Sequence, residues 1–430
     1  MRFFLSTSIL FLLATLGRAG GEWPQFRGPT GDGHSTAKNL PTTWSEKENI
    51  RWKTPIHDKG WSSPVIWGDQ IWLTTAKEKY ADNAPKENAA QKIPKPEWIE
   101  LYAICIDRLT GNVVHDILLR KEDKPDYCHS YNSYATPTPV LEEGRVYLHF
   151  GSHGTFCIDS KTGKPIWERL DLKCDHWRGP GSSPIIHDGK IFLTFDGYDQ
   201  QYVTALHSKD GTTAWKKDRK IKYSTTNPDL YKAYSTPSVF DIDGKQQLIS
   251  PSAECTIAYD PKNGDEIWRI HHGGMNAACK PVYGHKLIYL SSGHTANVLA
   301  VKQGGAGILA PEQVQWKTVK AGPSRPSFLL IDDALFTVSD TGFASCVDAK
   351  TGTQHWQERL SGAFCCSPTL AEGRVYIGDQ EGKFHVYAAK KEYEPIAVNT
   401  LDAGLMATPA FVGDAIYMRT KTHLYCIGKK

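Results

Sequence analysis

Two cationic side chains in neighbouring repeats of the sequence could together bind an anion. Lys280 occupies a position that holds serine or threonine in the seven other repeats, and Arg325 lies two residues before that position in the next repeat. An ammonium group and a planar guanidinium fork suit a carboxylate or a phosphate. Each could instead pair with a nearby acid or cover apolar surface with its stem. We predict that both face one opening, whose wall is completed by three further residues: Trp61, Tyr134 and Cys365.

Four cysteine and histidine residues form a second candidate group: Cys128, His129, Cys174 and His176. Their side chains are of the types that bind zinc. Neither pair has the Cys-x-x-Cys spacing, however, and a disulfide between Cys128 and Cys174 is equally natural in an oxidising compartment. Separate roles for the four residues are the third alternative. We therefore assign no metal site.

The adjacent residues Cys365 and Cys366 are an unusual pair in a sequence with ten cysteines. Cys366 falls in a column of the repeat that holds small residues throughout, so packing explains it, whereas Cys365 has no such explanation. We keep both as candidate ligand-binding residues of the same opening. No nucleophile motif or paired-carboxylate motif stands out, so no catalytic residue is assigned.

The candidate residues are positioned by a repeat with the pattern Asp-x-x-Thr-Gly-x-x-x-Trp. Aspartate can bond the backbone two residues on, and glycine supplies the positive φ that a tight turn needs. The tryptophan then lies on the next strand, where its ring can pack against a neighbouring unit. The turn residues are Asp107, Asp159, Asp260 and Asp348. The predicted structural tryptophans are Trp52, Trp167, Trp215, Trp268, Trp316 and Trp356.

A second motif, a small residue followed by proline, recurs between these copies and brings the count to eight units. Repeats of about 40 to 50 residues with four strands each are typical of propeller blades. We predict an all-β fold over residues 50–427: an eight-bladed β-propeller of four-stranded antiparallel blades. The last unit lacks an outer strand. The N-terminal strand around Trp52 should pair with it, which closes the ring and protects its edges.

Four cysteines occupy a column of the repeat that holds alanine elsewhere: Cys105, Cys157, Cys346 and Cys426. A place shared by alanine and cysteine is tight and buried, and cysteine acts there as a small hydrophobe. If the strands of a blade are lettered A (inner) to D (outer), the D–A links and B–C loops share one face of the ring. We call it the loop face, and the opposite one the turn face. The loop face is irregular and rich in polar and aromatic side chains, which favours it for function.

Residues 1–19 have the form of a secretory signal peptide, with a positive start, an apolar stretch and small residues before a cut after Ala19. A single membrane anchor is the alternative. We expect a periplasmic or secreted monomer with no membrane span after signal cleavage, in which residues 20–49 wrap the ring. The net charge is only +3 and no run rich in lysine and arginine occurs. This composition argues against a nucleic acid as partner.

The repeat resembles that of the quinoprotein, or PQQ-like, β-propellers over about residues 50–427. This group includes PQQ-dependent alcohol dehydrogenases and BamB-type outer-membrane assembly lipoproteins. The segment from Trp23 to Gly33 is similar to the start of exported bacterial PQQ-like repeat proteins without an assigned reaction. The resemblance is specific for the fold and weak for function. In the quinoprotein alcohol dehydrogenases a vicinal disulfide lies beside the cofactor, and the resemblance implies such a role for Cys365 and Cys366.

Three functions are therefore compatible with the sequence, and whether the chain is an enzyme stays open. The first is an exported non-catalytic propeller that binds a protein or polymer partner on the loop face without a cofactor. The second is a PQQ-dependent dehydrogenase acting on alcohols or sugars, which needs an aspartate base, calcium ligands and a flat pocket. No spacing in the sequence shows that set. The third is a lyase or hydrolase without a cofactor, working in the channel mouth.

Overall fold

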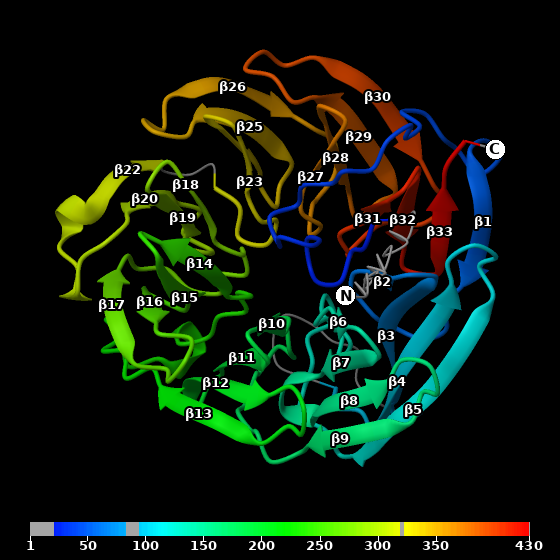
Figure 1. Ribbon diagram of the computed structural model, residues 1–430, viewed down its shortest axis with the longest axis horizontal. Helices are drawn as coiled ribbons and strands as arrows, with labels where there is room; N and C mark the ends of the chain where they lie inside the picture. The colour runs from blue at the N-terminus through cyan, green and yellow to red at the C-terminus, as the bar shows by residue number, and fades with distance from the viewer. Residues whose placement is uncertain (1–20, 83–93, 319–321, 430) are drawn as a thin grey trace, which may run out of the picture.

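The computed structural model describes residues 21–82, 94–318 and 322–429, and it confirms the predicted eight-bladed propeller. The blades stand around a central axis like sectors of a disc (Figure 1). The residues expected to form the signal peptide lie outside the described part. The helices of the described residues are three-residue 3-10 turns, and none is long and apolar enough to cross a membrane.

Each blade has four antiparallel strands, consecutive in the chain except in blades five and eight, and no strand of a blade is shorter than its innermost one. Blades one to four comprise β2 (Val65–Trp67), β3 (Gln70–Lys79), β4 (Trp98–Asp107), β5 (Val113–Asp123); β6 (Val140–Glu142), β7 (Arg145–His149), β8 (Thr155–Asp159), β9 (Pro165–Arg169); β10 (Ile185–His187), β11 (Lys190–Asp196), β12 (Gln201–His207), β13 (Thr213–Asp218); and β14 (Ser238–Ile242), β15 (Lys245–Pro251), β16 (Cys255–Tyr259), β17 (Glu266–His271). Blades five to seven comprise β18 (Val282–Gly284), β19 (Leu287–Ser291), β20 (Val298–Lys302), β22 (Val314–Thr318); β23 (Leu329–Ile331), β24 (Ala334–Val338), β25 (Phe343–Asp348), β26 (Gln354–Arg359); and β27 (Thr369–Ala371), β28 (Arg374–Gly378), β29 (Lys383–Ala388), β30 (Pro395–Thr400).

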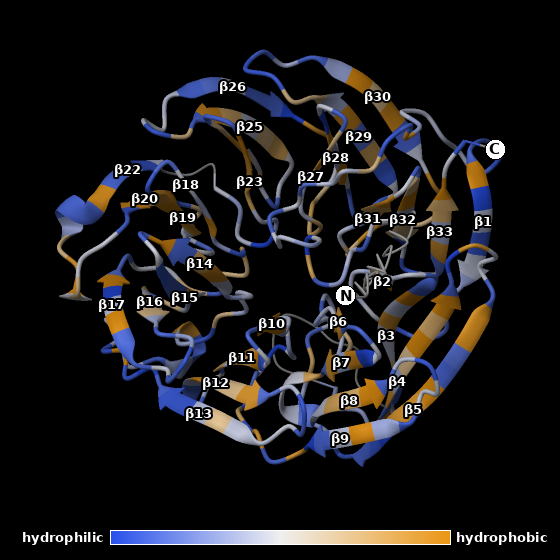
Figure 2. Ribbon diagram, viewed as in Figure 1, coloured by the Kyte–Doolittle hydropathy of each residue, from blue (hydrophilic) through white to orange (hydrophobic). Residues whose placement is uncertain are grey.

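The eighth blade joins the two ends of the chain, as predicted. It contains β31 (Ala410–Val412), β32 (Ala415–Arg419) and β33 (His423–Ile427), and its outer strand is β1 (Ile50–Pro55). The strands β1 and β33 pair antiparallel, with Trp52 opposite Cys426. This pairing leaves the ring without an open gap between first and last blade. Apolar residues concentrate in the strands and polar ones in the loops (Figure 2).

The repeated turns owe their shape to the aspartate at their start. The Asp159 carboxylate accepts hydrogen bonds from the backbone N–H groups of Lys161 and Thr162 and from the Thr162 hydroxyl. These bonds lower the pKa of Asp159, because they stabilise its charged form. Asp107 and Asp348 make the same set of bonds.

The tryptophan of one blade lies on the turn glycine of the next blade. A Cβ atom on Gly211 would lie 2.7 Å from the Trp167 ring, and one on Gly352 would lie 2.8 Å from the Trp316 ring. The indole N–H of each ring also donates to a backbone carbonyl of the next blade, 3.0 Å away for Trp167 and 2.9 Å for Trp316. Trp52 and Trp215 make the same contacts. Trp52 and Trp167 are only half-buried, whereas the other repeat tryptophans are buried.

Trp268 departs from this arrangement because blade five has no short turn to receive it. Its N–H donates to Gln247 of its own blade, 2.9 Å away. The longer connection in blade five instead adds the strand β21 (Gly307–Ile308) alongside β17, so that Gly307 lies opposite Trp268. The ring of Trp268 is fully buried as a result.

The column shared by cysteine and alanine lies directly across the sheet from these tryptophans. Cys157 pairs with Trp167, Cys346 with Trp356, and Ala205 with Trp215. A small side chain leaves room for the large ring beside it, and each pair is followed by a register shift in the ladder. All four cysteines of the column are buried. They are therefore part of the packing between strands.

A belt of hydroxyl groups joins the inner ends of the blades around the axis. In each step, a backbone N–H of one blade donates to a serine or threonine hydroxyl of the next blade, at 2.9 to 3.0 Å. The acceptors are Ser63, Thr138, Ser183, Thr236, Ser327, Ser367 and Thr408. The eighth position is Lys280, which offers no hydroxyl to the Thr236 N–H. This column of the sequence is thus a structural belt with one gap.

The N-terminal segment crosses the turn face and enters the axis (Figure 1). Trp23 pairs with Ile66 of blade one, and His34 pairs with Leu370 of blade seven. Between them Arg27 is fully buried, and its guanidinium donates to the carbonyl oxygens of Phe328 and Pro368 at the inner ends of blades six and seven. The segment therefore closes the channel from the turn face.

Replacing Gly211 by alanine should destabilise the ring more than replacing Gly189 does. Both glycines lie in blade three with similar φ, +72° and +66°, so the backbone strain of the two substitutions is alike. Only at Gly211 would the new methyl meet a tryptophan, and nothing lies within 4 Å of it at Gly189. We expect Gly211→Ala to cost about 1 to 3 kcal/mol more. Equal costs in chemical denaturation would mean that the ring contact is not tight.

Replacing Lys280 by threonine should stabilise the fold, because a hydroxyl there can accept the Thr236 N–H and complete the belt. This hydrogen bond should add about 1 kcal/mol to the free energy of unfolding. It also removes a buried cation. Burial and the charge of Arg27 lower the pKa of Lys280 from 10.5 to about 7. Below pH 7 the lysine is protonated in the folded and the unfolded chain, and its full penalty applies. The free-energy penalty of burying the charge falls as the pH rises from 7 to 10.5. Above pH 10.5 the lysine is neutral in both the folded and the unfolded chain, and no penalty is left.

The stability gained by Lys280→Thr should therefore be greatest below pH 7 and shrink towards pH 10.5. Urea denaturation at a series of pH values measures it, with Lys262→Thr, at an exposed turn position, as the control. A gain that does not change with pH would contradict the buried cation, and a loss at every pH would contradict the belt.

Candidate functional site

A cavity of about 500 Å³ opens at the axis on the loop face, and we call it the mouth cavity. Part of its lining is the hydroxyl belt, and Phe26 of the N-terminal segment lines it as well. Its outer wall carries aromatic and charged residues from the D–A links and B–C loops: Trp61, His129, Tyr131, Arg178, Tyr234, His294, Arg325 and Asp340. The loop face, favoured by the sequence, is thus the side on which this cavity lies.

The structure does not bring Lys280 and Arg325 into one opening. Arg325 lines the mouth cavity, whereas Lys280 lines a second cavity beneath the belt, beside Gly31. Arg325 moreover forms an ion pair with Asp340. The prediction of a shared anion site was wrong because side chains next to one another in the repeat can leave the belt towards opposite faces.

The other predicted wall residues divide between the mouth cavity and the core. Trp61 and Cys365 line the mouth cavity. Tyr134 is fully buried, and its hydroxyl donates to the carbonyl oxygen of Asp126. Cys366 is buried, and its thiol donates to the Gly378 carbonyl 2.9 Å away. Tyr134 and Cys366 are therefore packing residues in this structure.

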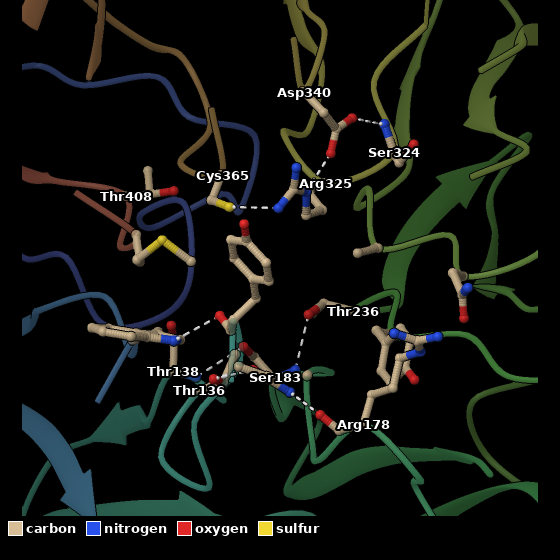
Figure 3. A pocket seen from close by; sticks show the side chains of 18 of the residues that line it. Thr136, Thr138, Arg178, Ser183, Thr236, Ser324, Arg325, Asp340, Cys365 and Thr408 are labelled. Carbon is tan, nitrogen blue, oxygen red and sulfur yellow. Dashed lines mark hydrogen bonds and ion pairs between the residues drawn. The ribbon is translucent and has the colours of Figure 1, made fainter. Parts of the chain in front are cut away.

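Arg325, Asp340 and Cys365 form one polar cluster on the wall (Figure 3). The Arg325 guanidinium bonds Asp340 and lies 3.2 Å from the Cys365 sulfur, which also accepts from the Gln380 amide at 3.0 Å. The second Asp340 oxygen accepts the Ser324 N–H at 2.6 Å. Burial raises the pKa of Cys365 to about 11, although the Arg325 charge acts in the opposite direction. The thiol is thus neutral near pH 7.

Arg178 lies on another part of the wall, away from this cluster (Figure 3). Its backbone carbonyl accepts from the Asn132 amide at 2.8 Å, which fixes its place beside the link from blade one. The Arg178 Nε is buried without a hydrogen-bond partner, and no ion pair of Arg178 occurs within the described ranges. The mouth cavity therefore contains one guanidinium that is not neutralised by the protein.

Aromatic rings cover the entrance near blade one. Tyr131 is 67% exposed, and its ring stacks on His129 with centroids 5.7 Å apart. The Trp61 indole N–H donates to the Tyr131 carbonyl at 3.1 Å. Large rings with restricted side-chain freedom are good contact surfaces for a ligand or a partner.

Two members of the cysteine and histidine group, Cys174 and His176, form a buried packing cluster, whereas His129 lines the mouth cavity. Cys174 and His176 are neighbours, with the sulfur 3.5 Å from the ring Nδ1. Burial lowers the pKa of His176 to about 3, so the ring is neutral. Cys174 is a free thiol in the described part of the chain. The alternative of a Cys128–Cys174 disulfide is therefore not what the structure has.

The donor set of the mouth cavity does not match a calcium-bound quinone. Calcium takes six to eight oxygen ligands, several of them carboxylates. The lining offers one carboxylate, Asp340, and both of its oxygens are already bonded, to Arg325 and Ser324. Within the residues described, no three His, Cys, Asp or Glu side chains come together as a metal site. We derive no reaction step through this cofactor.

Two functional candidates were missed in the sequence. Arg178 stands in a D–A link rich in ligand-type side chains, but nothing in its spacing shows that it faces the axis unpaired. Arg27 lies in the glycine-rich N-terminal segment, whose glycines are the only available signal: Gly33 passes the Arg27 guanidinium so closely that a Cβ would lie 2.5 Å from it.

Several known proteins share parts of this sequence. Over 259 residues the chain is 22% identical to tetrathionate hydrolase of Acidithiobacillus ferrooxidans, covering 57% of this chain and 50% of that protein. Over 161 residues it is 29% identical to quinoprotein ethanol dehydrogenase of Pseudomonas aeruginosa, covering 34% of this chain and 25% of that protein. The chain thus spans half or less of the length of these two curated relatives.

Two solved structures share the fold. Quinohemoprotein alcohol dehydrogenase from Comamonas testosteroni matches with a TM-score of 0.63 at 12% identity, over 95% of this chain and 81% of that one. BamB from Moraxella catarrhalis matches with a TM-score of 0.53 at 11% identity, over 82% of this chain and 99% of that one. Identities this low establish the architecture alone.

The repeated turns, the tryptophan contacts and the closed ring extend over nearly the whole described chain. The sequence model of one family, described as outer membrane protein assembly factor BamB, matches residues 103–342 and 256–425. Together these two matches cover well over half of the 430 residues. The chain therefore belongs to this PQQ-like repeat family.

Proposed function

We propose that the protein is an exported, non-catalytic propeller that binds a protein partner through the mouth cavity on its loop face. The observation that carries the proposal is the Arg178 guanidinium, which has no ion pair within the described ranges, in a cavity whose entrance is lined by the exposed Tyr131 ring and the half-buried Trp61 ring. Such a site suits an extended segment that carries a carboxylate beside an apolar or aromatic side chain.

Four other ionisable groups of the mouth cavity support binding rather than catalysis. Arg325 and Asp340 neutralise one another. The Cys365 thiol is held neutral, and burial also lowers the pKa of His294. A general base or a nucleophile needs a pKa matched to its task near neutral pH and a reacting partner within reach. These four residues offer no such pair.

The family supports a protein as the occupant. The family model and one of the similar structures carry the name of an outer-membrane protein assembly factor. The pattern of residues 1–19 supports export, and we place the protein in the periplasm or outside the cell. A polymer such as a glycan is the other occupant of the same class, and it is distinguished by the test.

The experiment measures binding of short peptides to the full chain after signal removal. The probes are peptides with Asp or Glu beside Tyr or Leu, and calorimetry together with intrinsic tryptophan fluorescence reports their binding. Replacing Arg178 by glutamine should weaken binding roughly 10- to 100-fold, as expected for the loss of a charge-assisted hydrogen bond. The same change at Arg359, exposed on β26 and outside the cavity, should leave binding unchanged.

Three results would overturn the proposal. The first is equal binding of the peptides by the Arg178→Gln variant. The second is binding of neutral glycans alone. The third is tight binding of PQQ with calcium accompanied by oxidation of an alcohol, which would establish the quinoprotein alternative.

A further inference from the structure

A second cavity, of about 630 Å³, lies beneath the belt on the turn face, and we call it the lower cavity. One wall is the N-terminal segment from Gln25 to His34. The other walls come from the inner strands β10, β14 and β18 and from the turn after β23. Its lining is distinct from that of the mouth cavity, since no residue lines both.

Lys280 lies on the lining of the lower cavity and is only 3% exposed. Among the residues that the structure describes, its Nζ has no hydrogen bond and no ion pair. Lys232 is equally buried but is paired with Asp229, and it lines neither cavity. Lys280 is thus a buried amine that faces a cavity and that the protein leaves unpaired.

The N-terminal segment makes room for this amine. A Cβ atom on Gly31 would lie 2.3 Å from the Lys280 Nζ, so a larger residue there would displace the amine. Gly31 also has a φ of +71°, which glycine adopts without strain. The close approach of the backbone to Lys280 therefore explains the glycine at position 31, which the packing of the blades does not require.

The charges around Lys280 favour its neutral form. Burial, and then the charge of the buried Arg27 guanidinium, lower the pKa of Lys280 to about 7, and Asp32 acts in the opposite direction. The remaining titratable residues of the lower cavity are His34, His187, Tyr283, His285 and Asp332. At pH 7 about half of the Lys280 side chains are free amines, roughly a thousand times the fraction of an ordinary lysine.

We propose that Lys280 binds a small neutral aldehyde or hydroxyaldehyde covalently, as a Schiff base in the lower cavity. The amine nitrogen attacks the carbonyl carbon, a C–N bond forms, and the C–O bond breaks. The carbonyl oxygen leaves as water with the two protons of the amine, so no oxidant or reductant is needed. The ligand is neutral in this proposal because the Asp32 and Asp332 carboxylates on the lining offset the charges of Lys280 and the nearby Arg27, so that no net charge selects an anion.

The test uses the full chain with acetaldehyde or glyceraldehyde and sodium cyanoborohydride, which converts the imine to a stable secondary amine. Peptide mass spectrometry then measures the rate of modification at each lysine. We expect Lys280 to react at least tenfold faster than Lys232 at pH 7, with half-maximal rate near pH 7. Modification of Lys280 no faster than Lys232, or a half-maximal rate near pH 10, overturns the proposal.

Two variants separate the site from general reactivity. Lys280→Gln should lose the fast adduct while its circular dichroism and melting temperature show a folded ring. Asp32→Asn retains the oxygen that accepts the Thr30 hydroxyl and the His34 N–H, but it removes the charge that raises the pKa of Lys280. The half-maximal rate should therefore move to lower pH. A fast adduct that persists in folded Lys280→Gln, or an unchanged pH profile in Asp32→Asn, overturns the assignment.

Discussion

The contact of a tryptophan ring with a glycine of the next blade is the interaction on which the ring depends. A single four-stranded blade exposes apolar side chains on both faces and needs a neighbour on each side. The ring of Trp167 covers Gly211 so closely that no side chain fits between them. The indole N–H also donates to the Ser208 carbonyl of the next blade, which adds a directional bond to the junction. The junctions formed by Trp52, Trp167, Trp215 and Trp316 are thereby held at a fixed spacing.

The axis is organised by a different set of bonds. Seven hydroxyl groups receive the backbone N–H groups of the preceding blades, and the gap at Lys280 falls between blades four and five. From the turn face, Arg27 bonds the carbonyls of blades six and seven and closes the channel. Two separate cavities result, one above the belt and one beneath it. The sequence grouped Lys280 and Arg325 in one opening at the axis, whereas the structure divides them between the two faces.

The two cavities differ in how their charges are treated. Above the belt, Arg325 is neutralised by Asp340, and only Arg178 is left for a ligand. Beneath it, Lys280 forms no ion pair with any described residue, and its neutral form is stabilised by burial. An unpaired group of this kind destabilises a fold. Both groups lie at cavity walls, which is consistent with roles in binding. A bound ligand can supply the partner that Arg178 and Lys280 lack in the protein.

The repeat in the sequence determined the number of blades, their turns and the closure through Trp52, because the bonds of a tight turn and the pairing of strands are local and recur with a fixed spacing. It also placed Trp61, Cys365 and Arg325 at the mouth cavity. Only the tertiary structure decided that Lys280 faces the other side, that Tyr134 and Cys366 are buried, and that Arg27 and Arg178 reach the axis. The direction in which a side chain leaves a shared column depends on what the neighbouring blades and the N-terminal segment leave open, and those contacts join residues hundreds of positions apart.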